Sequence, residues 1–169
     1  MLSIRTPRGR LGLLALLILA LVTWLLRDLP KTLVSPKPEG SWRQCVRVVD
    51  GDTILLDGDE RIRLIGADTP ESVDPRRPVQ HFGKEAAAFT RRLAEGRRVR
   101  LEYDQARRDR YGRTLAYVYL EDDTFLNAEI IRQGYGHAYT RFPFRYSDDF
   151  RSYERAAREQ RRGLWADSD

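Results

Sequence analysis

Cysteine and histidine are almost absent from this chain of 169 residues, and both absences exclude kinds of chemistry. Cys45 is the only cysteine, so no intrachain disulfide can form, and its place at the start of an expected strand predicts a buried side chain. The two histidines, His81 and His137, have no candidate nucleophile or base as a partner, so neither is expected to act in catalysis. The sequence also lacks internal repeats and low-complexity tracts, and its length suits one domain with an appendage.

A strong charge imbalance is missing from most of the chain. The formal net charge of +5 comes mainly from residues 1–40, and the remainder is nearly neutral. A nucleic-acid interface must therefore be argued from local clusters of charge, because the net charge does not identify one.

The longest apolar run, Leu11–Leu26, lies near the N-terminus and follows a basic flank, residues 1–10. As a helix it would be about 24 Å long at ~1.5 Å per residue, slightly short of a ~30 Å hydrocarbon core. No convincing cleavage site follows, which favours an uncleaved signal anchor, a transmembrane helix, over a signal peptide removed with residues 1–34. Either alternative places the rest of the chain on the extracytoplasmic side, membrane-anchored or secreted, because the basic flank is retained inside.

A linker, residues 27–41, precedes the expected domain at 42–166. Alternating apolar and β-branched residues predict strands near 42–50, 52–57, 60–67, 98–104 and 113–120. Periodicity predicts a helix over 82–95, a short helix capped by Asn127 and a last helix capped by Ser147. Five strands with a helix between the third and fourth are typical of the OB-fold. The expected fold class is therefore α+β, a five-stranded OB-fold β-barrel with about three helices, preceded by the N-terminal apolar helix.

Carboxylates gather where neighbouring strands end, in the motifs Asp-Gly-Asp-Thr at 50–53 and Asp-Thr-Pro-Glu at 68–71. Short turns join these strand ends, so Asp52, Asp68 and Glu71 are expected at one edge of the sheet. Like charges repel, and a hard divalent cation with oxygen ligands, Ca²⁺ or Mg²⁺, would offset that repulsion.

An arginine in the strand between the two motifs, Arg63, supports a function for the carboxylates. A cation together with an arginine is the usual equipment for binding a phosphate group. Alternatively, Arg63 pairs with Asp52 or Asp68 for structural reasons alone, and each motif is only a turn. That alternative leaves a second arginine, Arg113, unexplained.

Six motifs occur in the order and spacing that resemble the staphylococcal nuclease (thermonuclease) family. They are Asp50-Gly51-Asp52-Thr53, Arg63-Leu64, Asp68-Thr69-Pro70-Glu71, Phe82-Gly83 with Glu85-Ala86, Tyr111-Gly112-Arg113 with Leu115-Ala116-Tyr117, and Asn127 to Gly134. The resemblance covers Arg43 to Trp165 and leaves out the N-terminal 40 residues. Ordered motifs over one domain are a far more specific signal than any one of them.

The resemblance implies a Ca²⁺-dependent endonuclease, a phosphodiesterase that hydrolyses DNA and RNA to 3′-phosphate products, with Ca²⁺ expected in preference to Mg²⁺. In this family pattern Asp52 and Asp68 would be side-chain metal ligands, and Thr69 would add its backbone carbonyl. Glu71 would orient or deprotonate the attacking water. The phosphate would be contacted by Arg63 and Arg113.

The resemblance also implies contacts to the rest of the substrate. Arg110 and Tyr111 match positions that contact the 3′-side phosphate, and Tyr139 matches a nucleotide-contacting tyrosine, although packing at the barrel mouth is an equally good interpretation. A second tyrosine expected two positions after Tyr139 is Arg141 here, so the base-side pocket departs from the pattern. Besides DNA and RNA, the expected partner is a membrane, through residues 11–26, and no obligate protein partner is evident.

Two other functions remain open from the sequence. A non-catalytic OB-fold module that binds nucleic acid or protein would keep the barrel without the chemistry, but the acids and arginines of the motifs are all present. A membrane adaptor could use the arginine stripe of the last helix, which consists of Arg151, Arg155, Arg158 and Arg162. Acids on the same helix make a solvated surface the simpler interpretation.

Overall fold

The computed structural model describes residues 40–73 and 78–166. The predicted anchor at 11–26, its basic flank and almost all of the linker lie outside the described residues. In the described part of the chain, no helix is long and apolar enough to cross a membrane.

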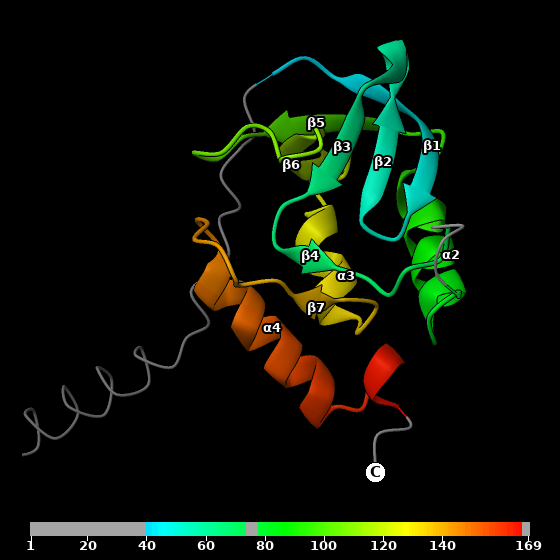
Figure 1. Ribbon diagram of the computed structural model, residues 1–169, viewed down its shortest axis with the longest axis vertical. Helices are drawn as coiled ribbons and strands as arrows, with labels where there is room; N and C mark the ends of the chain where they lie inside the picture. The colour runs from blue at the N-terminus through cyan, green and yellow to red at the C-terminus, as the bar shows by residue number, and fades with distance from the viewer. Residues whose placement is uncertain (1–39, 74–77, 167–169) are drawn as a thin grey trace, which may run out of the picture. The chain divides into compact units, whose positions relative to one another are not determined.

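A closed barrel of five strands forms within residues 40–73 and 78–166, in the order β1-β2-β3-β6-β5 (Figure 1). The bounds are β1 Arg43–Asp50, β2 Thr53–Leu56, β3 Arg61–Leu64, β5 Arg98–Glu102 and β6 Thr114–Leu120. Neighbouring strands are antiparallel except β3 and β6, which run parallel. The expected five-stranded barrel is therefore confirmed.

Helices and short elements surround the barrel. They are η1 Asp57–Asp59, β4 Ala67–Asp68, α2 Gly83–Ala94, α3 Leu126–Arg132, β7 His137–Ala138, α4 Ser147–Glu159 and η2 Gly163–Trp165. Helix α2 packs on β1, and α3 packs between β6 and α4, as Figure 1 shows. These three α-helices of the described chain agree with the prediction of about three.

The core lies inside the barrel and beneath α3. Strands β2 and β3 alternate, so that Ile54, Leu56, Ile62 and Leu64 are all buried. Strand β6 is buried almost throughout, because α3 covers its outer face. Each fully buried large apolar side chain contributes about 1.5–3 kcal/mol relative to an exposed one. The rigid barrel therefore holds the strand ends that carry the charged motifs.

The prediction of one strand over 60–67 is wrong. Strand β3 ends at Leu64, and β4 begins only at Ala67. Gly66 between them has a φ of 75°, and a Cβ there would lie 2.6 Å from Cζ of Phe144. Only glycine fits both the left-handed backbone and the close approach. The break turns the chain away from the barrel, and β4 pairs with β7 instead.

The predicted helix caps are also wrong. Helix α3 begins after Phe125, and Asn127 lies inside its first turn. The buried Asn127 side chain accepts a hydrogen bond from the backbone N–H of Val118 at 2.9 Å and donates one to the carbonyl of Ile65 at 2.9 Å. Asn127 therefore joins α3 to the barrel. Ser147 is the first residue of α4 and makes no capping hydrogen bond.

Candidate active site

The turn between β1 and β2 places Asp52 against the segment that follows β4. Gly51 is in contact with Thr69, and a Cβ on Gly51 would lie 2.6 Å from Oγ1 of Thr69. Any larger residue would separate the two segments. The buried Thr90 of α2 donates its hydroxyl to the Gly51 carbonyl at 2.6 Å, which ties the turn to the helix.

Asp52 is buried and strongly hydrogen-bonded. Its Oδ2 accepts hydrogen bonds from the backbone N–H of Thr69 at 2.9 Å and from the Thr69 hydroxyl at 3.1 Å. Burial raises the pKa of the Asp52 carboxyl, and the nearby Asp68 charge adds to the rise, whereas Arg63 opposes it. A positive charge beside Asp52 therefore stabilises the ionised form of its carboxyl group.

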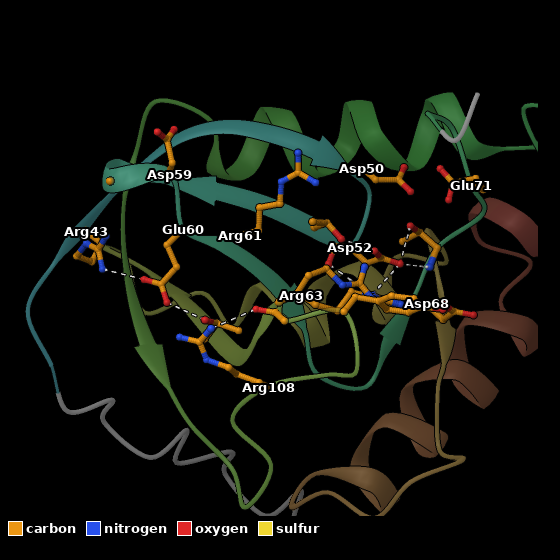
Figure 2. A pocket seen from close by; sticks show the side chains of 17 residues that line it. Arg43, Asp50, Asp52, Asp59, Glu60, Arg61, Arg63, Asp68, Glu71 and Arg108 are labelled. Carbon is orange, nitrogen blue, oxygen red and sulfur yellow. Dashed lines mark hydrogen bonds and ion pairs between the residues drawn. The ribbon is translucent and has the colours of Figure 1, made fainter. Parts of the chain in front are cut away.

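Arg63 bridges the two predicted metal ligands. One guanidinium nitrogen lies 2.8 Å from Oδ2 of Asp52, and the other lies 2.8 Å from Oδ1 of Asp68. Arg63 also donates to the Ala67 carbonyl at 2.6 Å. Figure 2 shows its side chain between the two aspartates. These contacts fix the planar fork at the base of the site.

Glu71 lies at the rim beside Asp50, as Figure 2 shows. Two hydrogen bonds hold its backbone: the Glu71 N–H donates to the Gln80 side-chain carbonyl at 2.8 Å, and the Gln80 N–H donates to the Glu71 carbonyl at 2.9 Å. Gly83 packs against the same segment, since a Cβ on it would lie 2.6 Å from the Glu71 carbonyl oxygen. No local pattern in the sequence indicates these roles for Gln80 and Gly83, because the contacts form only in the folded chain.

Asp50 is a further acid of the site, and the sequence alone predicted no role for it. Its side chain is 7% exposed, and its Oδ1 accepts hydrogen bonds from the Ser72 hydroxyl at 2.6 Å and the Gly51 N–H at 2.9 Å. Burial raises the pKa of Asp50 to about 6, and the charges of Asp52 and Glu71 contribute to the rise. The only feature of the sequence that could have indicated a role for Asp50 is the second aspartate of the motif at 50–53.

Arg113 enters from the loop between β5 and β6 and is oriented by Asp109. The Asp109 carboxylate accepts a hydrogen bond from Nε of Arg113 at 2.6 Å and another from the Arg113 backbone N–H at 3.0 Å. Burial alone would raise the pKa of Asp109, but these hydrogen bonds outweigh it and hold the pKa below its usual value. Asp109 therefore stays ionised and fixes the direction of Arg113.

Of the three residues predicted to contact the rest of the substrate, only Tyr111 lines the cleft that contains these acids and arginines. Tyr111 lines the same cleft and is 68% exposed, and Arg110 donates to its hydroxyl at 2.6 Å without lining the cleft itself. Tyr139 also lies outside the cleft lining. Its backbone N–H donates to the Gly66 carbonyl at 2.9 Å, and its side chain is 38% exposed.

The remaining predicted residues converge on one open cleft of about 940 Å³. They are Asp52, Arg63, Asp68, Thr69, Glu71, Tyr111 and Arg113. Strand ends and turns supply the acids, and strand β3 and the loop before β6 supply the arginines. The cleft therefore presents carboxylates and guanidiniums together to a bound phosphate.

The donor set is compatible with a hard cation, although not with an all-protein cage. Within the residues that the structure describes, no group of three or more His, Cys, Asp and Glu side chains is arranged to hold a metal ion. Asp52 and Asp68 offer carboxylate oxygens and Thr69 a carbonyl, which suit Ca²⁺ or Mg²⁺ with water and substrate as further ligands. Burial and the Asp68 charge both raise the pKa of Asp52, and a divalent cation beside the carboxylate would offset both effects.

An OB-type barrel with acids and arginines converging in one cleft defines a class of domain equipped to bind phosphodiesters. The chain belongs to the family described as staphylococcal nuclease homologue, whose model matches residues 61–167. The resemblance seen in the motifs is thereby confirmed at the level of the family.

Named relatives agree with this family. The chain is 42% identical over 125 residues to the thermonuclease of Staphylococcus hyicus, covering 72% of this chain and 73% of the relative. It is 54% identical over 95 residues to the thermonuclease of Staphylococcus intermedius, covering 54% of this chain and 56% of that relative. It is 35% identical over 128 residues to endonuclease YncB of Bacillus subtilis (strain 168), covering 72% and 60%. The match thus spans less than two thirds of the latter two proteins.

Proposed function

We propose that the domain is a metal-dependent endonuclease that hydrolyses DNA and RNA to 3′-phosphate products. The convergence of Asp52, Asp68 and Arg63 with Glu71 and Arg113 in one cleft carries this proposal. The similarity to thermonucleases and to an endonuclease supports nuclease activity. A module that only binds would have no use for this set of groups.

The two arginines supply electrostatic stabilisation. A phosphodiester is negatively charged and repels hydroxide, and its transition state carries more charge on the equatorial oxygens. Arg63 and Arg113 present planar guanidiniums that are held in place before substrate binds, by Asp52, Asp68 and Asp109. Donors organised in advance lower the barrier without the cost of reorganisation.

Glu71 is proposed to orient or deprotonate the attacking water. A carboxylate at the rim can accept a proton when it lies within hydrogen-bonding distance of the water. Gln80 and Gly83 hold the Glu71 backbone from two sides, which restricts the position of its side chain.

A calcium ion, in preference to magnesium, would be held by Asp52 and Asp68 with the Thr69 carbonyl. When bound, the ion would supply Lewis-acid stabilisation of the phosphate charge. Asp52 is kept ready for this role by the hydrogen bonds from Thr69, which fix the orientation of its carboxylate.

The proposal is tested by incubating the full chain with single-stranded DNA and RNA in millimolar Ca²⁺, in Mg²⁺ or in chelator. Cleavage should occur with calcium and stop with EGTA. Asp52→Asn and Asp68→Asn should abolish it, whereas the control Asp149→Asn, at an exposed position on α4, should not. Equal cleavage in EGTA and calcium would rule out the metal role. Binding without any cleavage would favour the OB-fold binding module instead.

A tether is proposed as well, on the sequence alone. The apolar run at 11–26 would anchor the protein in the membrane, with the domain on the side opposite the basic flank. The protein should then be found in the membrane fraction with its N-terminus intact. A mature N-terminus between residues 27 and 45 would identify a cleaved signal and a secreted domain instead.

A further inference from the structure

The cleft extends well beyond the proposed reaction centre. Its far end is lined by the turn η1 and by the side chains of Arg43, Glu60, Arg61 and Arg108. Its volume of about 940 Å³ lies at the upper end of the ~300–1,000 Å³ that is typical of pockets for small ligands. The cleft therefore has room for more than a single phosphate group.

The arginines that line this cleft fall into two groups. Arg43, Arg63 and Arg113 each form ion pairs with carboxylates, and Arg43 does so with Asp57 at 2.6 Å and Glu60 at 3.2 Å. These carboxylates therefore partly offset the positive charges of the three arginines before any substrate binds.

Arg61 and Arg108 form the second group. In the described part of the chain, neither guanidinium lies within ion-pair distance of a carboxylate. Arg108 donates one long hydrogen bond, 3.4 Å, to the Gly112 carbonyl, and both residues are exposed. Two cations therefore face the cleft with their donors available for an anionic ligand.

The spacing along β3 matches a repeating anion. Arg61 and Arg63 are two residues apart on the same face of the strand, whereas Ile62 between them is buried in the core. At ~3.3 Å per residue, their Cα atoms are about 6.6 Å apart. Successive phosphates of an extended nucleic-acid strand are separated by a similar distance. If a nucleic-acid strand lies along β3 with one phosphate at Arg63, its next phosphate lies at Arg61.

Arg108 reaches the same end of the cleft from another element. Its backbone pairs with Thr114, which is the partner of Ile62 across the β3–β6 pair. The loop that carries Arg108 therefore lies beside the beginning of β3. Figure 2 shows the side chains of Arg61 and Arg108 apart from each other, so they would contact different parts of a strand.

The acids at this end do not cancel the two arginines. Asp57 and Glu60 are paired with Arg43, and Glu60 also accepts a hydrogen bond from the Thr114 hydroxyl at 2.8 Å. Asp59 is the remaining acid of η1 among the residues that line the far end. Among the residues that line this end of the cleft, three arginines (Arg43, Arg61 and Arg108) face two acids (Asp59 and Glu60).

We propose that Arg61 and Arg108 bind backbone phosphates adjacent to the scissile one, so that the cleft holds an extended single strand of several nucleotides. The inference rests on the proposed nuclease function and deepens it. It assigns the substrate class as an oligonucleotide bound through neighbouring phosphates, independent of base sequence, because phosphate contacts carry no direct sequence information.

The test is steady-state kinetics of the full chain on an octanucleotide in calcium, with Arg61→Ala and Arg108→Ala. A contact to a neighbouring phosphate is present in the ground state and the transition state alike, so KM should rise about threefold to tenfold with kcat unchanged. Arg61→Lys should recover most of the loss, since lysine also binds phosphate as a point charge. Arg155→Ala, at an exposed position on α4, is the matched control and should leave KM unchanged.

Salt dependence gives a second measurement that a structural role would not change. Each lost phosphate contact should reduce the slope of log kcat/KM against log salt by about 0.7. A parent-like KM and slope in both alanine variants would overturn the inference while leaving the nuclease function intact. A fall in kcat with unchanged KM would place the arginines in the chemistry or the fold and would also overturn it. A parent protein that cleaves nothing would overturn the proposed function and the inference together.

Discussion

Gly83 offers a sharp test of how the fold positions Glu71. It is the first residue of α2 and is buried. A Cβ at this position would lie 2.6 Å from the Glu71 carbonyl oxygen and 3.1 Å from the Pro70 carbonyl oxygen. Both neighbours are backbone atoms, so a rotamer change cannot relieve the contact. In Gly83→Ala, the helix or the Glu71 segment must move by a few tenths of an ångström.

The expected magnitude follows from two opposing effects. Alanine is favoured over glycine in a helix by about 0.5–1 kcal/mol, whereas overpacking a filled site costs about 1–3 kcal/mol. The variant Gly83→Ala should therefore be destabilised by about 1 kcal/mol. A misplacement of ~1 Å can cost about 10²-fold in rate, so the smaller displacement of Glu71 should lower kcat about tenfold.

The assay combines urea unfolding with steady-state kinetics on an oligonucleotide. Gly96→Ala is the control, because Gly96 has a φ of 76° but an added Cβ would have no neighbouring atom within 4 Å. It should lose about 1–2 kcal/mol through left-handed backbone strain and keep its kcat. A Gly83→Ala protein that is more stable than the parent and equally active would refute the reasoning.

Two further predictions concern the arginines and the response to acid. Lysine keeps the charge but loses the planar fork, so Arg63→Lys and Arg113→Lys should each lower kcat by about 10²–10³-fold, whereas Arg110→Lys should mainly raise KM a few-fold. Steady-state kinetics on one oligonucleotide distinguishes these effects, and parent-like rates for the first two would make those arginines structural. Burial alone would raise the pKa of Asp104, but hydrogen bonds, chiefly from the Tyr117 hydroxyl at 2.5 Å, outweigh it and hold the pKa below its usual value. That stabilisation is present above the unfolded pKa of about 3.9 and is lost as the pH falls through the lower folded value, so Asp104→Asn should flatten the dependence of the urea midpoint on pH below about pH 4. An equally steep dependence in the variant would contradict this account.

The sequence by itself determined the local features of this protein. Alternating apolar residues predicted the barrel strands, because side chains on a strand face opposite sides with a period of two. Turn-forming Gly, Asp and Pro marked the strand ends, and those turns were enough to predict that Asp52, Asp68 and Glu71 share one edge of the sheet. The ordered motifs were specific enough to identify the family, which the match over residues 61–167 confirms.

Only the tertiary structure decided which distant groups meet. The parallel pairing of β3 with β6 closes the barrel and brings Arg108 and Arg113 to the same cleft as Arg63, although they are far from it in sequence. Asn127 was predicted to cap a helix because asparagine is common at helix N-termini. In the folded chain its side chain is buried against the barrel and hydrogen-bonds to the backbone of Val118 and Ile65. The raised pKa of Asp50 likewise depends on desolvation by neighbours that pack over it. Burial and long-range contact are properties of the folded chain, and no local pattern of residues specifies them.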